Sequence, residues 1–125
     1  MTVCDPEIGS RLAVLTSYAH IVEAAPALIA VYLDQEKMYD PVKDHQAAGA
    51  CMQNMLLAAH ELGLGAVWLG QILKYKEQVN EVLQLSDQYD LMALIALGYP
   101  QHRNQQSRRQ PLTDFILHEF GGKKP

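Results

Sequence analysis

Apolar runs alternate with short polar or turn-forming breaks along this chain. Two runs, 27–33 (ALIAVYL) and 89–99 (YDLMALIALGY), are largely apolar and end at polar residues or at Gly and Pro. Runs of this length and composition are typical of strands buried on both faces. A shorter run, 66–69, follows a Gly-x-Gly break and predicts another strand. The pattern therefore places three strands along the chain, with room for a helix before each of them.

The segments between these strands carry helical signals. Asp5 and Pro6 suit the cap and the first turn of a helix, and the apolar residues after them recur on one face. We expect this first helix to end near His20. A further amphipathic helix is expected at 75–85, with its valine and leucine side chains turned inward.

The segment from Gln46 to Leu62 predicts the longest helix, which is apolar on nearly every side. Asp40 and Pro41 break the chain before it, and Asp44 is interpreted as its cap. Its first half is rich in small residues, which let another backbone approach closely. Its polar residues occupy one narrow stripe with seven-residue spacing: Gln46, Gln53, Asn54, His60 and Glu61.

A chain of 125 residues has difficulty enclosing such a helix. One domain of this size buries only about two-thirds of the surface that its unfolded chain exposes. We therefore expect a single domain over residues 1–125, in which a second copy of the chain covers part of the central helix through a symmetric contact. The alternating helices and strands, followed by a polar stretch at 101–110 and apolar residues at 111–116, predict an α/β or α+β layered fold.

Composition and charge exclude several classes of protein. Apolar residues make up 49% and charged residues 19%, which is typical of a globular protein and not of a disordered chain. A net charge of −4 gives no general attraction for nucleic acid. The N-terminus has no signal pattern, and no apolar run reaches the roughly 20 residues of a membrane span. We expect a cytoplasmic protein without nucleic-acid or membrane partners, in which the distant Cys4 and Cys51 do not indicate a disulfide framework.

The sequence nominates neither a metal site nor a catalytic side chain. The six-residue step from His45 to Cys51 separates these side chains around a helix, and His60 completes no ligand cluster. No Gly-rich phosphate loop and no nucleophile–base pair is found. Trp68, at the end of a predicted strand, is more often a core residue than the wall of a cofactor site.

One long segment, 47–70, carries the pattern Q-N-x-x-L-A-A-x-x-L-G-L-G-x-x-W-x-G. It resembles the central helix and following strand of the nitroreductase family of flavin enzymes. Two further pieces occur in the order that the family has them. Residues 25–29 (APALI) resemble its A-P-x-x-I strand entry, and 97–100 (LGYP) with 108–112 (RRQPL) resemble its L-G-Y-P and R-[KR]-P-L close. The resemblance covers most of the chain.

This resemblance implies an α+β fold with helices on both sides of a sheet, a long buried central helix and a homodimer. It also implies an oxidoreductase in which NAD(P)H would reduce FMN by hydride transfer, and the flavin would reduce a nitroaromatic, quinone or similar acceptor, with no acid–base side chain required. Carried over by position, the main chain of Leu69, Gly70 and Gln71 would contact the isoalloxazine edge. Arg108 and Arg109 would bind the FMN phosphate. Many relatives have a second glycine in place of Gln71.

Two family motifs are not found in this sequence: R-R-S-x-R, whose arginines hold the flavin phosphate, and P-S-x-x-N-x-Q-P-W, near the ring. Residues 1–7 instead resemble the interior of the family's first strand leading into a helix. An alternative hypothesis is therefore a truncated, non-catalytic dimer of this fold that binds FMN weakly or not at all. A third hypothesis keeps the fold and changes the chemistry, since relatives resemble deiodinases, dehydrogenases and flavin-fragmenting enzymes. The sequence identifies neither the acceptor nor a preference for NADH or NADPH.

Overall fold

The structure is a computed structural model that describes residues 1–102, 106–118 and 120–121. Its sheet consists of β1 (Thr2–Val3), β2 (Ala27–Asp34), β4 (Tyr89–Gly98) and β3 (Gly65–Leu69), in this spatial order. All neighbouring strands are antiparallel. The central pair, β2 and β4, runs from Ala27 opposite Leu97 to Asp34 opposite Tyr89. The three strands expected from the apolar runs are confirmed, and β3 lies at an edge of the sheet.

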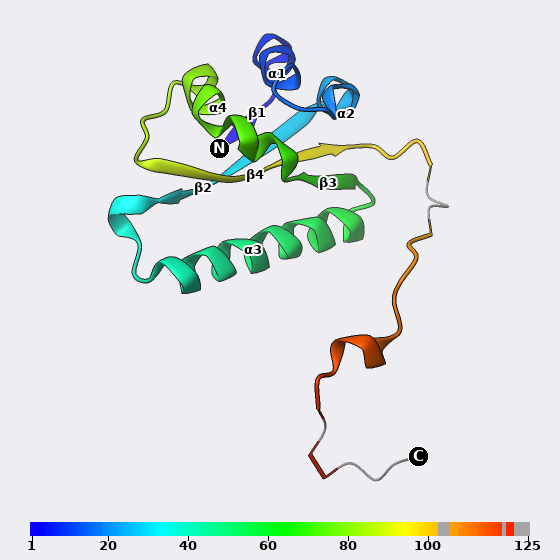
Figure 1. The fold of residues 1–125 in the computed structure, drawn as a ribbon. Helices are drawn as coiled ribbons and strands as arrows, with labels where there is room; N and C mark the ends of the chain where they lie inside the picture. Colours follow the sequence, from blue (N-terminus) through cyan, green and yellow to red (C-terminus); the bar gives the residue numbers. More distant parts are fainter. Residues whose placement is uncertain (103–105, 119, 122–125) are drawn as a thin grey trace.

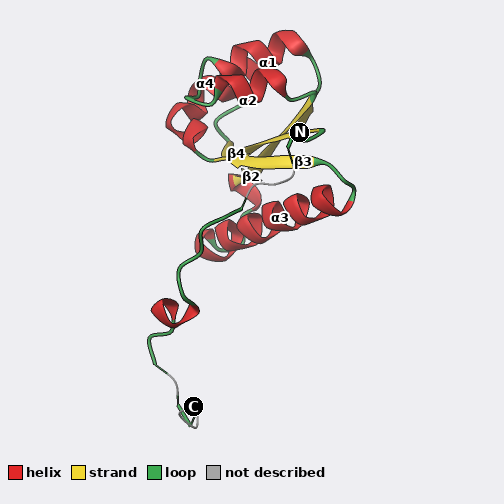
Figure 2. Cartoon of the chain, turned by 90° about the vertical axis from the view of Figure 1, so that its right-hand side faces the viewer, coloured by secondary structure: helices red, strands yellow, loops and turns green. Residues whose placement is uncertain are grey.

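Helices cover both faces of this sheet (Figures 1 and 2). One face carries α1 (Pro6–Ala13), α2 (Ala19–Ala24) and α4 (Lys76–Leu83), and the other carries α3 (Pro41–Glu61). The α+β fold with two helical layers is therefore confirmed. A helical layer packs on each face of the central strands, which explains their nearly continuous apolar sequences.

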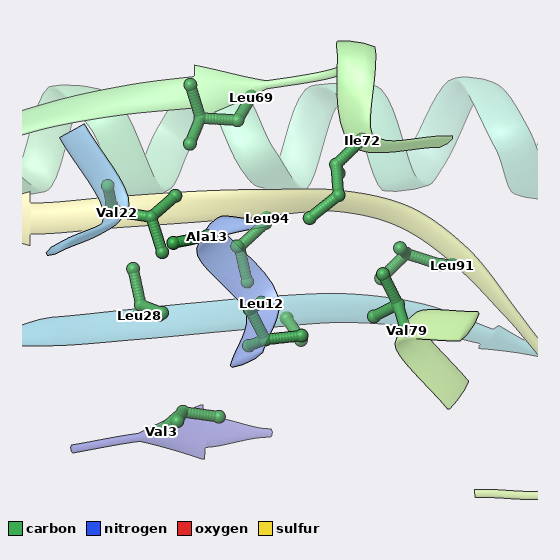
Figure 3. Close-up of a cluster of buried hydrophobic side chains, with 12 residues drawn as sticks. Val3, Leu12, Ala13, Val22, Leu28, Leu69, Ile72, Val79, Leu91 and Leu94 are labelled. Carbon is green, nitrogen blue, oxygen red and sulfur yellow. The ribbon is translucent and has the colours of Figure 1, made fainter. Parts of the chain in front are cut away.

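Two groups of buried side chains fill the spaces on either side of the sheet. The larger group joins the sheet to α1, α2 and α4, and Figure 3 shows side chains from the strands and helices converging there. The smaller group joins the other face of β2 and β4 to α3, through Ala48, Met52, Ala93 and Ile95. Leu12, Leu94 and Ile72 are fully buried in the larger group. Most of the enclosed apolar volume thus lies on the face opposite α3.

The prediction of one helix from Pro6 to near His20 is wrong. The chain forms α1, leaves the helical path at 14–18 and enters α2 at Ala19. The Thr16 hydroxyl accepts a hydrogen bond from the Tyr18 N–H (3.2 Å), a local bond that competes with helical pairing. Asp5 does cap α1, since its side chain accepts from the N–H of Glu7 at 2.8 Å.

The start predicted for the central helix is also wrong, because α3 begins at Pro41 and not at Gln46. Asp40 is the N-cap, and its Oδ1 accepts from the Lys43 N–H at 3.0 Å. Asp44 lies inside the first turn, where its Oδ2 accepts from the N–H groups of Tyr39 (2.7 Å) and Asp40 (2.9 Å). The two carboxylates together satisfy donors that a helix start leaves free.

A single chain covers only one stripe of α3. Ala48, Met52 and Ala59 are buried against the sheet, whereas Leu57 is 58% exposed and Cys51 is exposed as well. Within one chain, the apolar character of the helix therefore exceeds what the sheet covers. No helix in the described part of the chain is long and apolar enough to cross a membrane.

Beyond β4 the described chain runs away from the helices and the sheet (Figure 1). This C-terminal tail, residues 106–118, includes the short 3₁₀ helix η3 (Leu112–Phe115). Its apolar side chains are exposed: Leu112, Phe115, Ile116 and Leu117.

Candidate functional site

The candidate site is the turn at which β3 ends and the 3₁₀ helix η2 (Gln71–Tyr75) begins. Leu69 is buried and packs with Ile72 in the larger core (Figure 3), so both ends of the turn are fixed by apolar contacts. Gly70 between them is the N-cap of η2, and no side chain of the described residues caps this helix. The first N–H groups of a helix have no partner within it. The turn therefore presents main-chain donors at the sheet edge.

Trp68 stands directly before this turn. A Cβ added at Gly70 would lie 3.8 Å from the indole Nε1, and one added at Gly49 in α3 would lie 3.9 Å from the far end of the same ring. The two glycines thus leave the indole space between the turn and α3. Trp68 is 39% exposed, so it is only partly enclosed by its own chain.

A cavity of about 420 Å³ lies beside the Trp68 indole, on the α3 side of the sheet. Its volume falls within the range of small-molecule sites. Aromatic and apolar side chains contribute much of its wall, with three charged or titratable side chains among them. The lining residues are His45, Gly49, Met52, Trp68, Leu73, Lys76, Asp90, Leu91 and Met92.

The polar side of this cavity is an ion pair between Lys76 and Asp90. The Lys76 ammonium lies 2.8 Å from Oδ1 of Asp90, and the His45 Nε2 lies 3.8 Å from Oδ2. The carboxylate of Asp90 raises the pKa of Lys76 through a hydrogen bond and through its charge. The lysine therefore stays charged at neutral pH, and its charge is balanced within the cavity wall.

Gln71 bonds to a part of the chain far away in sequence. Its Oε1 accepts hydrogen bonds from the Thr16 hydroxyl (2.8 Å) and from the Ser17 N–H (2.9 Å). Both donors belong to the loop between α1 and α2, more than 50 residues earlier. The side chain of Gln71 thus connects the candidate turn to the helical layer on the opposite face from the cavity.

The far end of β3 is held by the proline and glycine motifs. A Cβ on Gly98 would lie 3.0 Å from Pro26 Cδ, and one on Gly65 would lie 3.3 Å from Pro100 Cβ. The A-P, G-L-G and L-G-Y-P pieces, which are distant in sequence, therefore meet at one end of the sheet. Small residues are needed there because the proline rings lie against the main chain.

Arg108 and Arg109 lie in the exposed tail, and one chain does not bring them to the turn (Figure 1). The Nε of Arg109 donates to the Ser107 hydroxyl at 3.1 Å. Neither guanidinium forms an ion pair with another described residue. The predicted cofactor residues therefore form two separate groups in the single chain. One is the turn Leu69–Gln71, and the other is the pair of arginines in the tail.

The structure adds residues that the sequence reasoning did not select. Thr16 reaches the turn through a side-chain bond, and Asp90 and Lys76 meet in the cavity wall. Thr16 and Gln71 are separated by 55 residues, which no local pattern reveals. Within the ranges that the structure describes, no group of three His, Cys, Asp or Glu side chains could hold a metal ion.

Known proteins match this chain both in sequence and in structure. The sequence model of the nitroreductase family matches residues 8–99. A solved structure from Desulfovibrio desulfuricans, described as a nitroreductase in complex with FMN, is 46% identical in sequence with a TM-score of 0.89. The superposition covers 95% of this chain and 70% of that one.

Two curated proteins are more distant. Bacillus subtilis YfhC, described as an NAD(P)H nitroreductase, is 30% identical over 87 residues, which make up 70% of this chain and 45% of that protein. The NADPH-flavin oxidoreductase of Vibrio harveyi is 28% identical over 129 residues, covering 94% of this chain and 53% of that protein. The chain thus spans about half the length of the curated relatives it matches.

Proposed function

The chain belongs to the nitroreductase family, and we propose that it is an FMN-dependent oxidoreductase that passes hydride from NAD(P)H through the flavin to a nitroaromatic, quinone or similar acceptor. The proposal draws on the FMN complex of the Desulfovibrio relative and on the names of the Bacillus and Vibrio proteins.

The uncapped turn at Leu69–Gly70–Gln71 is the observation that carries the proposal. FMN, when bound, supplies a ring that accepts hydride at N5 and delivers electrons onward, and its behaviour depends on nearby hydrogen bonds. The turn offers main-chain N–H groups at a sheet edge, and Gly70 has no side chain to keep a ring away. Such donors support the proposal that the edge of an isoalloxazine ring lies at this turn.

The cavity beside Trp68 supports the same conclusion. Trp68, Met52 and Met92 give it an apolar wall suited to a planar ring and able to exclude water. The Lys76–Asp90 pair adds a polar side without leaving a net charge. In this proposal the protein orients and shields the reacting groups, and no side chain has to act as an acid or base.

Arg108 and Arg109 are proposed to bind the FMN phosphate. A guanidinium can place two N–H groups on phosphate oxygens, and neither arginine is committed to an acidic partner among the described residues. Within one chain these arginines lie in the tail and away from the turn (Figure 1). Phosphate binding therefore requires that the tail pack against a flavin site.

We also propose a homodimer. The exposed apolar residues of α3 and of the tail, including Leu57, Phe115 and Leu117, leave more apolar surface open than an isolated small domain usually tolerates. A second copy of the chain is the proposed cover. Sedimentation over a dilution series tests this, and a monomer at micromolar concentration would contradict it.

The first experiment is an absorbance spectrum of the purified protein after incubation with FMN and desalting. Flavin retained at about one per chain, and bleached anaerobically by NADH or NADPH, is the expected result. Reoxidation by a quinone then tests the acceptor. A colourless protein would favour the alternative of a non-catalytic dimer of this fold that does not hold FMN.

The arginines are tested in the double variant Arg108→Gln/Arg109→Gln. Charged hydrogen bonds contribute about 1.5–3 kcal/mol each, so we expect FMN to bind at least about 10-fold more weakly. The control, Arg11→Gln/Lys43→Gln, removes the same charge from α1 and α3 and should leave binding unchanged. Equal loss in both variants would mean that only the overall charge matters.

A further inference from the structure

Gln71 differs from the other residues of the candidate turn because its side chain takes part in a long-range bond. Its Oε1 accepts two hydrogen bonds at 2.8 and 2.9 Å, from the Thr16 hydroxyl and the Ser17 N–H. Two donors on one oxygen restrict its position more than one would. The oxygen is thereby held from two directions at the base of η2.

Thr16 is suited to hold this oxygen because it is itself fixed. It is only 8% exposed, one of two buried polar side chains within the described ranges. Its hydroxyl donates to Gln71 and accepts from the Tyr18 N–H at 3.2 Å. The hydroxyl therefore connects the turn directly to the residue that precedes α2.

Gly70, at the centre of the turn, has no side chain that could form a hydrogen bond of this kind. Leu69 and Ile72 anchor it through apolar packing on one face of the sheet. Gly70 contributes no side chain, and its carbonyl accepts from the Leu73 N–H at 3.2 Å inside η2. The bonds of Gln71 therefore add a polar anchor directly after the most adaptable residue of the turn.

We propose that Gln71 and Thr16 are positioning residues, which hold the main chain of the turn at a fixed distance from the flavin ring and thereby tune its reduction. This inference rests on the proposed function, in which that main chain contacts the ring. Neither side chain needs to touch the flavin.

The test uses FMN-loaded protein and four variants: Thr16→Val, Thr16→Ser, Gln71→Leu and Thr16→Val/Gln71→Leu. The measured quantities are the FMN dissociation constant and the reduction potential of the bound flavin. Thr16→Val removes one of the two hydrogen bonds to Gln71, and one such bond contributes about 1 kcal/mol, so the ratio of affinities for oxidised and reduced flavin should change about fivefold. For a two-electron couple this corresponds to a shift of about 20 mV.

The inference predicts how the flavin potential of each variant compares with that of the parent protein. Gln71→Leu removes both bonds and should shift the potential more than Thr16→Val does. Thr16→Ser keeps the hydroxyl and should restore the potential of the parent protein. The double variant should have the same flavin potential as Gln71→Leu, because Gln71→Leu already removes the hydrogen bond between Thr16 and residue 71. Thr2→Val, on the exposed part of β1, is the matched control and should have no effect.

A purely structural role would lower thermal stability and leave the potential of the bound flavin unchanged, and that result would overturn the inference. A serine variant with the same shift as the valine variant would do so too, as would additive effects in the double variant. If the parent chain itself holds no FMN, the proposed function fails first. A parent chain that holds FMN, with potentials equal in all variants, refutes only the positioning role.

Discussion

The contact between Gly98 and Pro26 allows a sharp test of why the glycine of the L-G-Y-P motif is needed. A Cβ built on Gly98 would lie 3.0 Å from Pro26 Cδ, whereas ordinary van der Waals contact begins at 3.4 Å. The proline ring cannot rotate away as a flexible side chain would. The substitution Gly98→Ala therefore requires β2 and β4 to separate locally, at the point where Ala27 pairs with Leu97.

The size of the effect follows from two opposing contributions. Overpacking by a methyl group costs about 1–3 kcal/mol. Replacing glycine also reduces the freedom of the unfolded chain, which favours folding by about 0.5–1 kcal/mol. We expect Gly98→Ala to lower the free energy of unfolding by about 1–2 kcal/mol. Gly9→Ala is the matched control, since an added Cβ there meets nothing within 4 Å; it should raise stability by about 0.5–1 kcal/mol in α1.

Urea unfolding followed by circular dichroism measures both variants. A third variant, Pro26→Ala, removes the ring carbon and should reduce the cost of Gly98→Ala in a double-mutant cycle. The reasoning is refuted if Gly98→Ala is as stable as the parent chain. An equal cost with and without the proline ring would also refute it, since the clash would then not be the cause.

Two further predictions concern single side chains. The Tyr32 hydroxyl is buried with no hydrogen-bond partner among the described residues, and burial raises the pKa of Tyr32 to about 12. Because the pKa of Tyr32 in the folded state exceeds the unfolded value of 10.0, the neutral hydroxyl favours the fold below pH 10, and this contribution is lost as the pH rises through 12. Tyr32→Phe should therefore flatten the loss of stability that urea unfolding measures between pH 9 and 11.5. An unchanged slope would contradict this. Asp40→Ala removes the cap of α3 and should lower the free energy of unfolding by about 1 kcal/mol, whereas Asp40→Asn should lower it much less. Equal losses of stability in urea unfolding would show that the cap bond is not the cause.

The helix boundaries follow only in part from local capping signals. Asp5 directly before Pro6 predicts a cap that the structure confirms, whereas 40–44 offers two aspartates and the sequence pattern favours the wrong one. In the structure both carboxylates bond to the start of α3 from different sides. Local capping signals identify the presence of a helix start, and spatial arrangement decides which residue is the cap.

The candidate site likewise contains residues that the sequence could select and contacts that only the folded chain forms. The turn at Leu69–Gln71 could be selected from the sequence because the family resemblance, carried over by position, places a cofactor-binding turn directly after the recognisable helix and strand. Its connection to Thr16 depends on a bond across 55 residues, and the Lys76–Asp90 pair forms only when α4 packs beside β4. The roles predicted for the three turn residues and for Arg108 and Arg109 stay predictions.

The apolar pattern alone predicts β2 and β4, because a strand covered on both faces needs a largely apolar run, and 27–33 and 89–99 provide one. The sequence also carries the ordered motifs on which the family resemblance rests. The sequence pattern does not predict the strand order β1-β2-β4-β3, the break between α1 and α2 or the stripe of α3 that one chain covers; these follow from how the elements pack. The physical reason is that hydrophobicity along a chain specifies how much surface must be buried, whereas the partner that buries it is chosen by packing and hydrogen bonds between residues far apart in sequence.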